Sequence, residues 1–253
     1  MTGKLEGKVV ILAGAGGIGD GLAERYAEDG ANLIIGDING DHGAALAERL
    51  DPSGKQVIGL HLDGADETSI ESAVKLAVSE FGKLTGFHAN FACGADSVHP
   101  EGLQIPMELF DEVMRVNVRG FMLCSRLAVP AMIDAGGGAL VYTSSTAATT
   151  GSAVRFGYGM AKAAIQALAR HVAFAHGKDG IRANAIAPGF ISHPKIVAKL
   201  PGVAEQAMSR AAIRTRVGQP SDVAAVGSLL LSDDGSYITG QVITVDAGIT
   251  MRP

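Results

Sequence analysis

The sequence predicts a single α/β domain over residues 1–253, with a parallel sheet and helices on both of its faces. Short apolar segments alternate along the chain with longer segments in which apolar residues recur at helical spacing. Such alternation is typical of β-α-β crossovers, which cover both faces of a parallel sheet. A chain of 253 residues is long enough for one domain of this kind, and it contains no linker, internal repeat or low-complexity tract. The predicted architecture is therefore doubly wound.

The first half of the chain contains three strand–helix pairs and then a fourth strand. The predicted strands are short and largely apolar: Lys8–Ala13, Asn32–Gly36, Gln56–Leu62 and Leu84–Phe91. Each of the first three is followed by a segment with helical periodicity: Ile18–Asp29, Asp41–Leu50 and Glu67–Phe81. The fourth strand is the weakest of the set, because a polar residue, His88, lies in its middle.

The second half repeats the same alternation. Helices are predicted over Met107–Ile133, Tyr158–His176 and Ser221–Ser232, and strands over Ala139–Thr143, Ile181–Ala187 and Val242–Asp246. The long helix contains Asn117, which is a poor helix former. Pro220, Ser221 and Asp222 form a start signal for the last helix.

Composition excludes several classes of function. The net charge of −5 and the pI near 5.8 disfavour a nucleic-acid partner or an anionic membrane surface. The two cysteines, Cys93 and Cys124, have no metal-type or C-x-x-C spacing, so we expect reduced thiols and no metal site. The first residues are polar, and no run of about 18 apolar residues occurs. We therefore expect a cytoplasmic protein that does not enter a membrane.

A glycine-rich turn follows the first predicted strand and opens the first helix. Gly14, Gly16 and Gly19 satisfy the G-x-G-x-x-G spacing, with Gly17 and Ile18 between them. Glycine is needed where the backbone must approach a pyrophosphate, and the following helix presents unpaired N–H groups to that anion. The spacing is weak on its own, because a glycine-rich turn can simply link a strand to a helix.

An acidic residue strengthens the interpretation of this turn as a dinucleotide site. Asp37 ends the second predicted strand, 18 residues after Gly19. A carboxylate there accepts hydrogen bonds from the ribose hydroxyls of adenosine and repels a 2′-phosphate. No lysine or arginine lies in the turn or directly after Asp37. The sequence therefore favours NAD over NADP as the cofactor.

Three polar residues in the second half suggest a catalytic site. Tyr158 and Lys162 lie four positions apart and therefore share one face of a helix. Ser145 lies just past the Ala139–Thr143 strand, at the edge of a parallel sheet where ligands bind. A tyrosine and a lysine at this spacing are also common by chance, as a surface pair.

The chain resembles the short-chain dehydrogenase/reductase family from Lys4 to Met251. The family's Asn–Ser–Tyr–Lys tetrad falls on Asn117 (in VMRVNVRG), Ser145 (in VYTSST), Tyr158 and Lys162 (in YGMAK). Two further family patterns appear as IRANAIAPG, which begins at Ile181, and as YITGQ followed by VDAG, which begins at Tyr237. Because several motifs occur in register, the match is far more specific than any one motif alone.

The resemblance implies an oxidoreductase that moves a hydride between NAD and a small alcohol or ketone. Tyr158 would be the general acid/base, and Ser145 would bind the substrate oxygen. Lys162 would lower the pKa of Tyr158 and hold the nicotinamide ribose, and Asn117 would position a water. The resemblance also implies a Rossmann fold and a homotetramer. The implied cofactor contacts are Gly14, Gly16, Gly17, Ile18, Gly19, Asp37, Asp63, Asn90, Tyr158, Lys162, Pro188, Gly189 and Ile191.

Three positions depart from the family pattern. Ala13 replaces a threonine, and the glycine turn is one residue shorter, so that Gly16 occupies a spacer position. The fourth-strand motif Asn-Asn-Ala-Gly becomes Ala89-Asn90-Phe91-Ala92, with bulkier residues beside the expected adenosine. His193 occupies the position of a threonine that contacts nicotinamide, and we expect it to be an exposed loop residue.

Two other functions remain open at this point. A 3-oxoacyl thioester reductase is common in the family, but it usually uses NADPH and has a basic residue in the glycine turn, which this chain lacks. An NAD-sensing regulator that retains the fold without turnover is the alternative from another class. Residues 190–216 are expected to form a lid over the substrate.

Overall fold

The protein has one seven-stranded, fully parallel sheet. The computed structural model describes residues 3–94, 102–193 and 202–251. The strand order is β3-β2-β1-β4-β5-β6-β7, and every neighbouring pair is parallel. The strands are β1 (Val9–Ala13), β2 (Asn32–Asp37), β3 (Val57–His61), β4 (Gly86–Ala89), β5 (Gly138–Thr143), β6 (Ile181–Pro188) and β7 (Val242–Val245). The predicted doubly wound architecture is confirmed.

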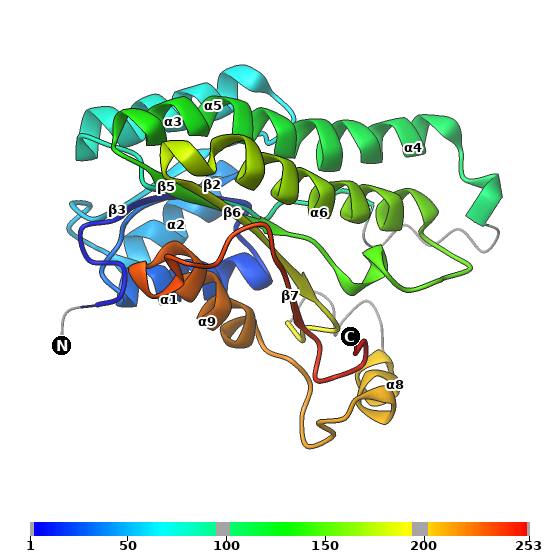
Figure 1. The fold of residues 1–253 in the computed structure, drawn as a ribbon. Helices are drawn as coiled ribbons and strands as arrows, with labels where there is room; N and C mark the ends of the chain where they lie inside the picture. The colour runs from blue at the N-terminus through cyan, green and yellow to red at the C-terminus, as the bar shows by residue number, and fades with distance from the viewer. Residues whose placement is uncertain (1–2, 95–101, 194–201, 252–253) are drawn as a thin grey trace.

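Helices cover both faces of the sheet (Figure 1). One layer contains α3 (Glu67–Phe81), α4 (Met107–Met114), α5 (Gly120–Asp134) and α6 (Phe156–His176). The opposite layer contains α1 (Ile18–Glu28), α2 (Gly40–Leu50) and α9 (Pro220–Leu231). A short helix, α8 (Val203–Arg210), lies apart from both layers, near the last described residues of the chain.

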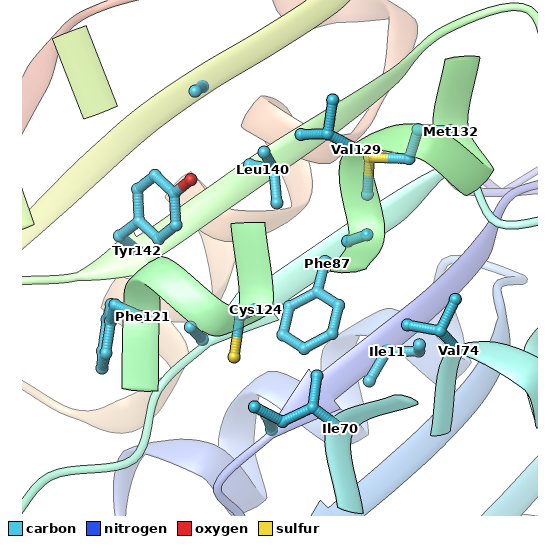
Figure 2. Close-up of a cluster of buried hydrophobic side chains, with 14 of the residues drawn as sticks. Ile11, Ile70, Val74, Phe87, Phe121, Cys124, Val129, Met132, Leu140 and Tyr142 are labelled. Atoms are coloured by element: carbon cyan, nitrogen blue, oxygen red, sulfur yellow. The ribbon is translucent and has the colours of Figure 1, made fainter. Parts of the chain in front are cut away.

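The core is divided between the two faces of the sheet. Val10 and Leu12 of β1 belong to the cluster beneath α1, α2 and α9, whereas Ile11 belongs to the cluster beneath α3, α5 and α6. Figure 2 shows part of the second cluster, in which Phe87 of β4 lies between Ile70 of α3 and Cys124 of α5. All five residues of β1 are buried, as expected for a central strand with both faces covered.

The order of the strands predicts a crevice at the carboxyl edge of the sheet. The chain runs from β1 to β2 and β3 in one direction, and then returns to place β4 on the other side of β1. At such a reversal the crossovers after the two central strands diverge, and ligands bind in the opening. The glycine turn follows β1 and Asn90 follows β4, so both lie at this edge.

The predicted long helix is continuous but not uniformly α-helical. Between α4 and α5, residues Arg115–Arg119 form a π-helical segment, η2, with Asn117 at its centre. Such segments are rare and occur often at functional sites. The combined helix Met107–Asp134 has the length and the mean hydropathy, 1.2, of a membrane-spanning helix. Half of that apolar window is buried inside the protein, which is typical of a core helix.

The histidine that interrupts the fourth strand has a structural place in the core. His88 is fully buried in β4. Its Nδ1 is hydrogen-bonded to the hydroxyl of Tyr26 on α1 (2.7 Å), and its Nε2 to the hydroxyl of Thr143 on β5 (2.9 Å). Burial lowers the pKa of His88 to about 3. The imidazole is therefore neutral near pH 7 and links helix α1 to strand β5.

We predict that His88→Leu lowers the free energy of unfolding at pH 7. We also predict that the variant loses less of this stability than the wild type as the pH falls. The buried hydroxyls of Tyr26 and Thr143 lose a partner, which costs about 1–3 kcal/mol. In the wild type the unfolded histidine titrates near pH 6.5 and the folded one near 3, so the unfolded state binds more protons between these values. Stability therefore falls as the pH drops through this window, by up to about 1.4 kcal/mol per pH unit.

Urea unfolding at pH 7 and pH 5 measures both effects. The control is His171→Leu, which removes an exposed histidine from α6 and should keep the wild-type pH dependence. If His88→Leu loses as much stability between the two pH values as the wild type does, the linkage argument is wrong.

Candidate active site

The glycine turn between β1 and α1 is shaped by close backbone contacts. A Cβ on Gly14 would lie 2.5 Å from the backbone nitrogen of Phe91, and one on Gly19 would lie 2.2 Å from the carbonyl oxygen of Gly14. Gly14 also has a φ of +102°, which favours glycine. Side chains are thus excluded where the turn meets β4. The turn brings Gly16, Gly17 and Ile18 to the start of α1, which has no side-chain cap at Gly17. This arrangement fits a pyrophosphate.

Two carboxylates lie at the ends of β2 and β3. Asp37 is the last residue of β2, and its Oδ1 accepts a hydrogen bond from the backbone N–H of Asn39 (2.8 Å). The N–H of Gly14 donates to the carbonyl of Gly36 (2.7 Å), so the glycine turn lies directly beside Asp37. Asp63 follows β3, and its Oδ1 accepts from the N–H of Ala65 (2.8 Å). Asp63 therefore stabilises the turn that follows β3.

Asn90 connects the fourth strand to the glycine turn. Its Nδ2 donates to the carbonyl oxygen of Gly14 (2.8 Å), and its Oδ1 accepts from the hydroxyl of Thr143 (2.8 Å). Thr143 therefore links His88 to Asn90, a role that our sequence analysis missed. The available signal was a hydroxyl residue at the end of an otherwise apolar strand, directly before Ser144 and Ser145.

The ring of the bulky Phe91 packs into the core. It lies against Phe121, with 4.8 Å between the ring centroids, and against the main core cluster. A Cβ on Gly64 would lie 2.4 Å from this ring, and one on Gly120 would lie 3.0 Å from it. Because two glycines leave the space that the ring occupies, the departure from the family motif is compensated within the core.

Tyr158 and Ser145 meet at the edge of the sheet, as predicted. Tyr158 is in the first turn of α6, and Ser145 follows β5, where its Oγ also accepts from the N–H of Ala147 (3.1 Å). Burial raises the pKa of Tyr158, while a hydrogen bond with Ser145 and the charge of Arg155 oppose that rise. The loss of hydration outweighs the two favourable contacts. The lowering that we expect when Lys162 and oxidised nicotinamide act together stays a prediction.

Lys162 is buried beneath Tyr158. Its Nζ lies 5.6 Å from the centre of the Tyr158 ring and 5.2 Å from that of Phe121, and it donates to the carbonyl oxygen of Thr143 (2.7 Å). Tyrosine and lysine thus share one helix face, as their spacing predicts. Burial lowers the pKa of Lys162 to about 7. Burial thus weakens the tendency of Lys162 to carry a positive charge near neutral pH.

Asn117 is buried in η2, and its side chain holds the segment that follows β4. Its Oδ1 accepts from the N–H of Cys93 (2.8 Å), and its Nδ2 donates to the carbonyl oxygen of Cys93 (2.8 Å). Both polar atoms of the Asn117 side chain are therefore engaged by the backbone of Cys93. The η2 segment itself packs against α6. Asn117 therefore lies in a segment that packs beside α6, the helix that carries Tyr158 and Lys162.

The segment after β6 completes the crevice. Pro188 ends the strand, and the N–H of Gly189 donates to the carbonyl of Val245 (2.9 Å). Ile191 is buried and forms a bridge with Gly218. His193 is partly buried rather than exposed, because its ring lies about 3 Å from where a Cβ on Gly17 would be. The expectation for His193 is corrected: it packs on the glycine turn.

The predicted lid is only partly described. Within residues 190–216, positions 194–201 lie outside the described residues, and the remainder includes α8. Ala212 and Ile213 donate to the carbonyl of Ala247 (2.9 and 3.1 Å), which ties the end of this segment to the chain after β7. Among the described residues, no group of three or more histidine, cysteine or acidic side chains could hold a metal ion.

Comparisons with known proteins agree with this geometry. A family model described as enoyl-(acyl carrier protein) reductase matches residues 12–250. The uncharacterized oxidoreductase YxbG of Bacillus subtilis is 37% identical, over 98% of this chain and 92% of the relative. The 7alpha-hydroxysteroid dehydrogenase of Escherichia coli K12 is 32% identical, over 97% and 95%. A solved 7alpha-hydroxysteroid dehydrogenase with NADH and 7-oxo glycochenodeoxycholic acid superposes with a TM-score of 0.89, at 31% identity, and covers 96% of this chain and 94% of that one.

Proposed function

Because the chain belongs to the short-chain dehydrogenase/reductase family, we propose that it transfers a hydride between NAD(H) and a secondary alcohol or ketone, with Tyr158 as general acid/base. The observation that carries this proposal is the hydrogen bond between Tyr158 and Ser145 above a buried Lys162. These groups lie at the carboxyl edge of the sheet, where the glycine turn also lies. Proton transfer and dinucleotide binding are thus supported at one crevice.

Each residue of the tetrad has a distinct part in the proposed reaction. Ser145 orients the substrate oxygen by a hydrogen bond, and Tyr158 gives that oxygen a proton in ketone reduction or accepts one in alcohol oxidation. The raised pKa of Tyr158 keeps the phenol protonated at neutral pH, which suits reduction. In oxidation, a protonated Lys162 would stabilise the phenolate. Asn117 positions the segment after β4 and, with η2, a water that exchanges protons with Lys162.

We propose NAD as the cofactor, and it supplies the hydride acceptor when bound. The glycine turn would hold its pyrophosphate, with Gly14, Gly16, Gly17, Ile18 and Gly19 as the proposed contacts. Asp37 would accept hydrogen bonds from the hydroxyls of the adenosine ribose. Asp63 and Asn90 would contact the neighbouring groups of the adenosine. Pro188, Gly189 and Ile191 would border the nicotinamide, whose ribose Lys162 and Tyr158 would contact. A similar solved protein is complexed with NADH, which supports this choice.

The proposed substrate is a small molecule, and 7alpha-hydroxysteroids are a reasonable first test because similar proteins act on them. A 3-oxoacyl thioester reductase is less favoured, since no basic residue lies in the glycine turn. An NAD sensor is less favoured because nucleotide binding alone would not need the hydrogen bond between Tyr158 and Ser145 over a buried Lys162. We further propose a cytoplasmic homotetramer, for which the exposed Phe174 offers apolar contact area.

Absorbance at 340 nm tests the proposal directly. We expect turnover of at least one member of a panel of secondary alcohols, hydroxysteroids and the matching ketones, with NAD preferred over NADP. Acetoacetyl thioesters form the second arm of the panel. Binding of NADH without turnover of any panel member would favour the sensor, and faster reduction of the thioester with NADPH would favour the acyl reductase.

A further inference from the structure

A further carboxylate, that of Asp20, lies at the glycine turn. The Oδ1 of Asp20, in the first turn of α1, accepts a hydrogen bond from the N–H of Gly16 (2.9 Å). The same oxygen accepts from Nε2 of His42 (2.9 Å), which is in the first turn of α2. The sequence did not single out either residue. Together they tie the shortened turn to the beginnings of two neighbouring helices.

This pair lies next to the proposed ribose site. Gly16 belongs to the turn whose Gly14 is hydrogen-bonded to Gly36, directly before Asp37. The helix that carries His42 begins three residues after Asp37, and Asp37 itself fixes the N–H of Asn39 (2.8 Å). Asp20 and His42 therefore lie on two segments, 14–20 and 37–42, that start together at one corner of the sheet edge. Both members of the pair are partly exposed, with 36% of each side chain accessible.

A nucleotide with a 2′-phosphate would need hydrogen-bond donors and positive charge at this corner. Two such donors exist there, the N–H of Gly16 and the imidazole of His42, but Asp20 engages both. Its negative charge also adds to that of Asp37, and both would repel a phosphate dianion. An adenosine ribose with a free 2′-hydroxyl carries no such charge and meets no comparable repulsion.

We propose that Asp20, acting with His42, is a second determinant of NAD over NADP selection, in addition to Asp37. Because Asp20 already accepts hydrogen bonds from the Gly16 N–H and the His42 ring, neither group can donate to a 2′-phosphate. This inference rests on the proposed function, because it assumes that the crevice binds a nicotinamide dinucleotide. It goes further in assigning part of the selectivity to a residue outside the glycine motif and outside the end of β2.

The test compares the dissociation constants of NADH and NADPH, measured by nucleotide fluorescence, in the purified protein. In Asp20→Ala we expect the ratio of the NADPH constant to the NADH constant to fall roughly tenfold, since one repulsive charge is lost and two donors are released. Asp20→Ala/His42→Leu should regain part of the discrimination, because the imidazole donor that Asp20→Ala releases is removed. Asp20→Asn keeps the side-chain shape and provides a second variant if Asp20→Ala folds poorly.

Glu24→Ala is the matched control. Glu24 lies one turn further along α1 and pairs with Arg49 of α2 (2.7 Å), so this variant also removes one carboxylate that bridges the two helices. We expect an unchanged ratio. An unchanged ratio in both Asp20 variants, with wild-type NADH affinity and melting temperature, overturns the inference and leaves the proposed function standing. An equal shift in Glu24→Ala overturns it too. Absence of NADH binding by the wild type overturns the proposed function and this inference together.

Discussion

Tyr158→Phe is expected to lower kcat by about 10³-fold while NADH affinity stays within about twofold of the wild type. Phenylalanine retains the aromatic ring that lies 5.6 Å from the Nζ of Lys162, so the packing of α6 should survive. It removes the hydroxyl that is hydrogen-bonded to Ser145 and would exchange a proton with the substrate oxygen. Because the lost hydroxyl is the group that would exchange a proton with the substrate, while Lys162 would still contact the nicotinamide ribose, the main effect should fall on the chemical step.

Steady-state turnover at 340 nm and NADH fluorescence titration measure the two parts of this prediction. Tyr237→Phe is the matched control, since it removes the same hydroxyl from a fully exposed tyrosine and should leave both quantities unchanged. If Tyr158→Phe retains more than a tenth of wild-type kcat, Tyr158 is not the general acid/base. If it loses NADH affinity to the same degree as kcat, its role is in binding instead.

Gly19→Ala is expected to weaken NADH binding by roughly ten- to a hundredfold. The new methyl group would lie 2.2 Å from the carbonyl oxygen of Gly14 and 3.1 Å from Nδ2 of Asn90. These two atoms are hydrogen-bonded to each other (2.8 Å), and the first belongs to the backbone, so neither can move without distorting the turn. Overpacking of this kind costs about 1–3 kcal/mol, and each 1.4 kcal/mol taken from binding is a factor of ten.

Fluorescence titration with NADH and a thermal melt check this prediction. Gly177→Ala provides the control, because no atom lies within 4 Å of its added Cβ and its φ is −59°. That variant should bind NADH normally and be as stable as the wild type or slightly more so. Normal NADH affinity in Gly19→Ala would mean that the glycine turn is not the pyrophosphate site.

The irregular features of the fold trace back to particular residues. Asn117 is a poor helix former, and the long predicted helix indeed changes to a π-helical turn around it. The fourth strand is shorter than predicted, since both Asn90 and Phe91 donate to the carbonyl of Ala13 and leave the ladder. His88, which weakened that strand in the sequence, is accommodated through two buried hydroxyls. A local pattern identifies such positions but not the partners that stabilise them.

The sequence by itself determined the order of strands and helices, the glycine spacing after β1, and the shared helix face of Tyr158 and Lys162, because these depend on neighbours within a few residues. Only the tertiary structure decided where the ring of Phe91 points, what Asp20 binds, and in which direction the pKa values of Tyr158 and Lys162 move. Each of these depends on space, hydration or hydrogen-bond partners supplied by other elements of the chain. Gly64 and Gly120 make room for Phe91, His42 reaches Asp20 from another helix, and the packing of α6 on β5 removes water from Lys162.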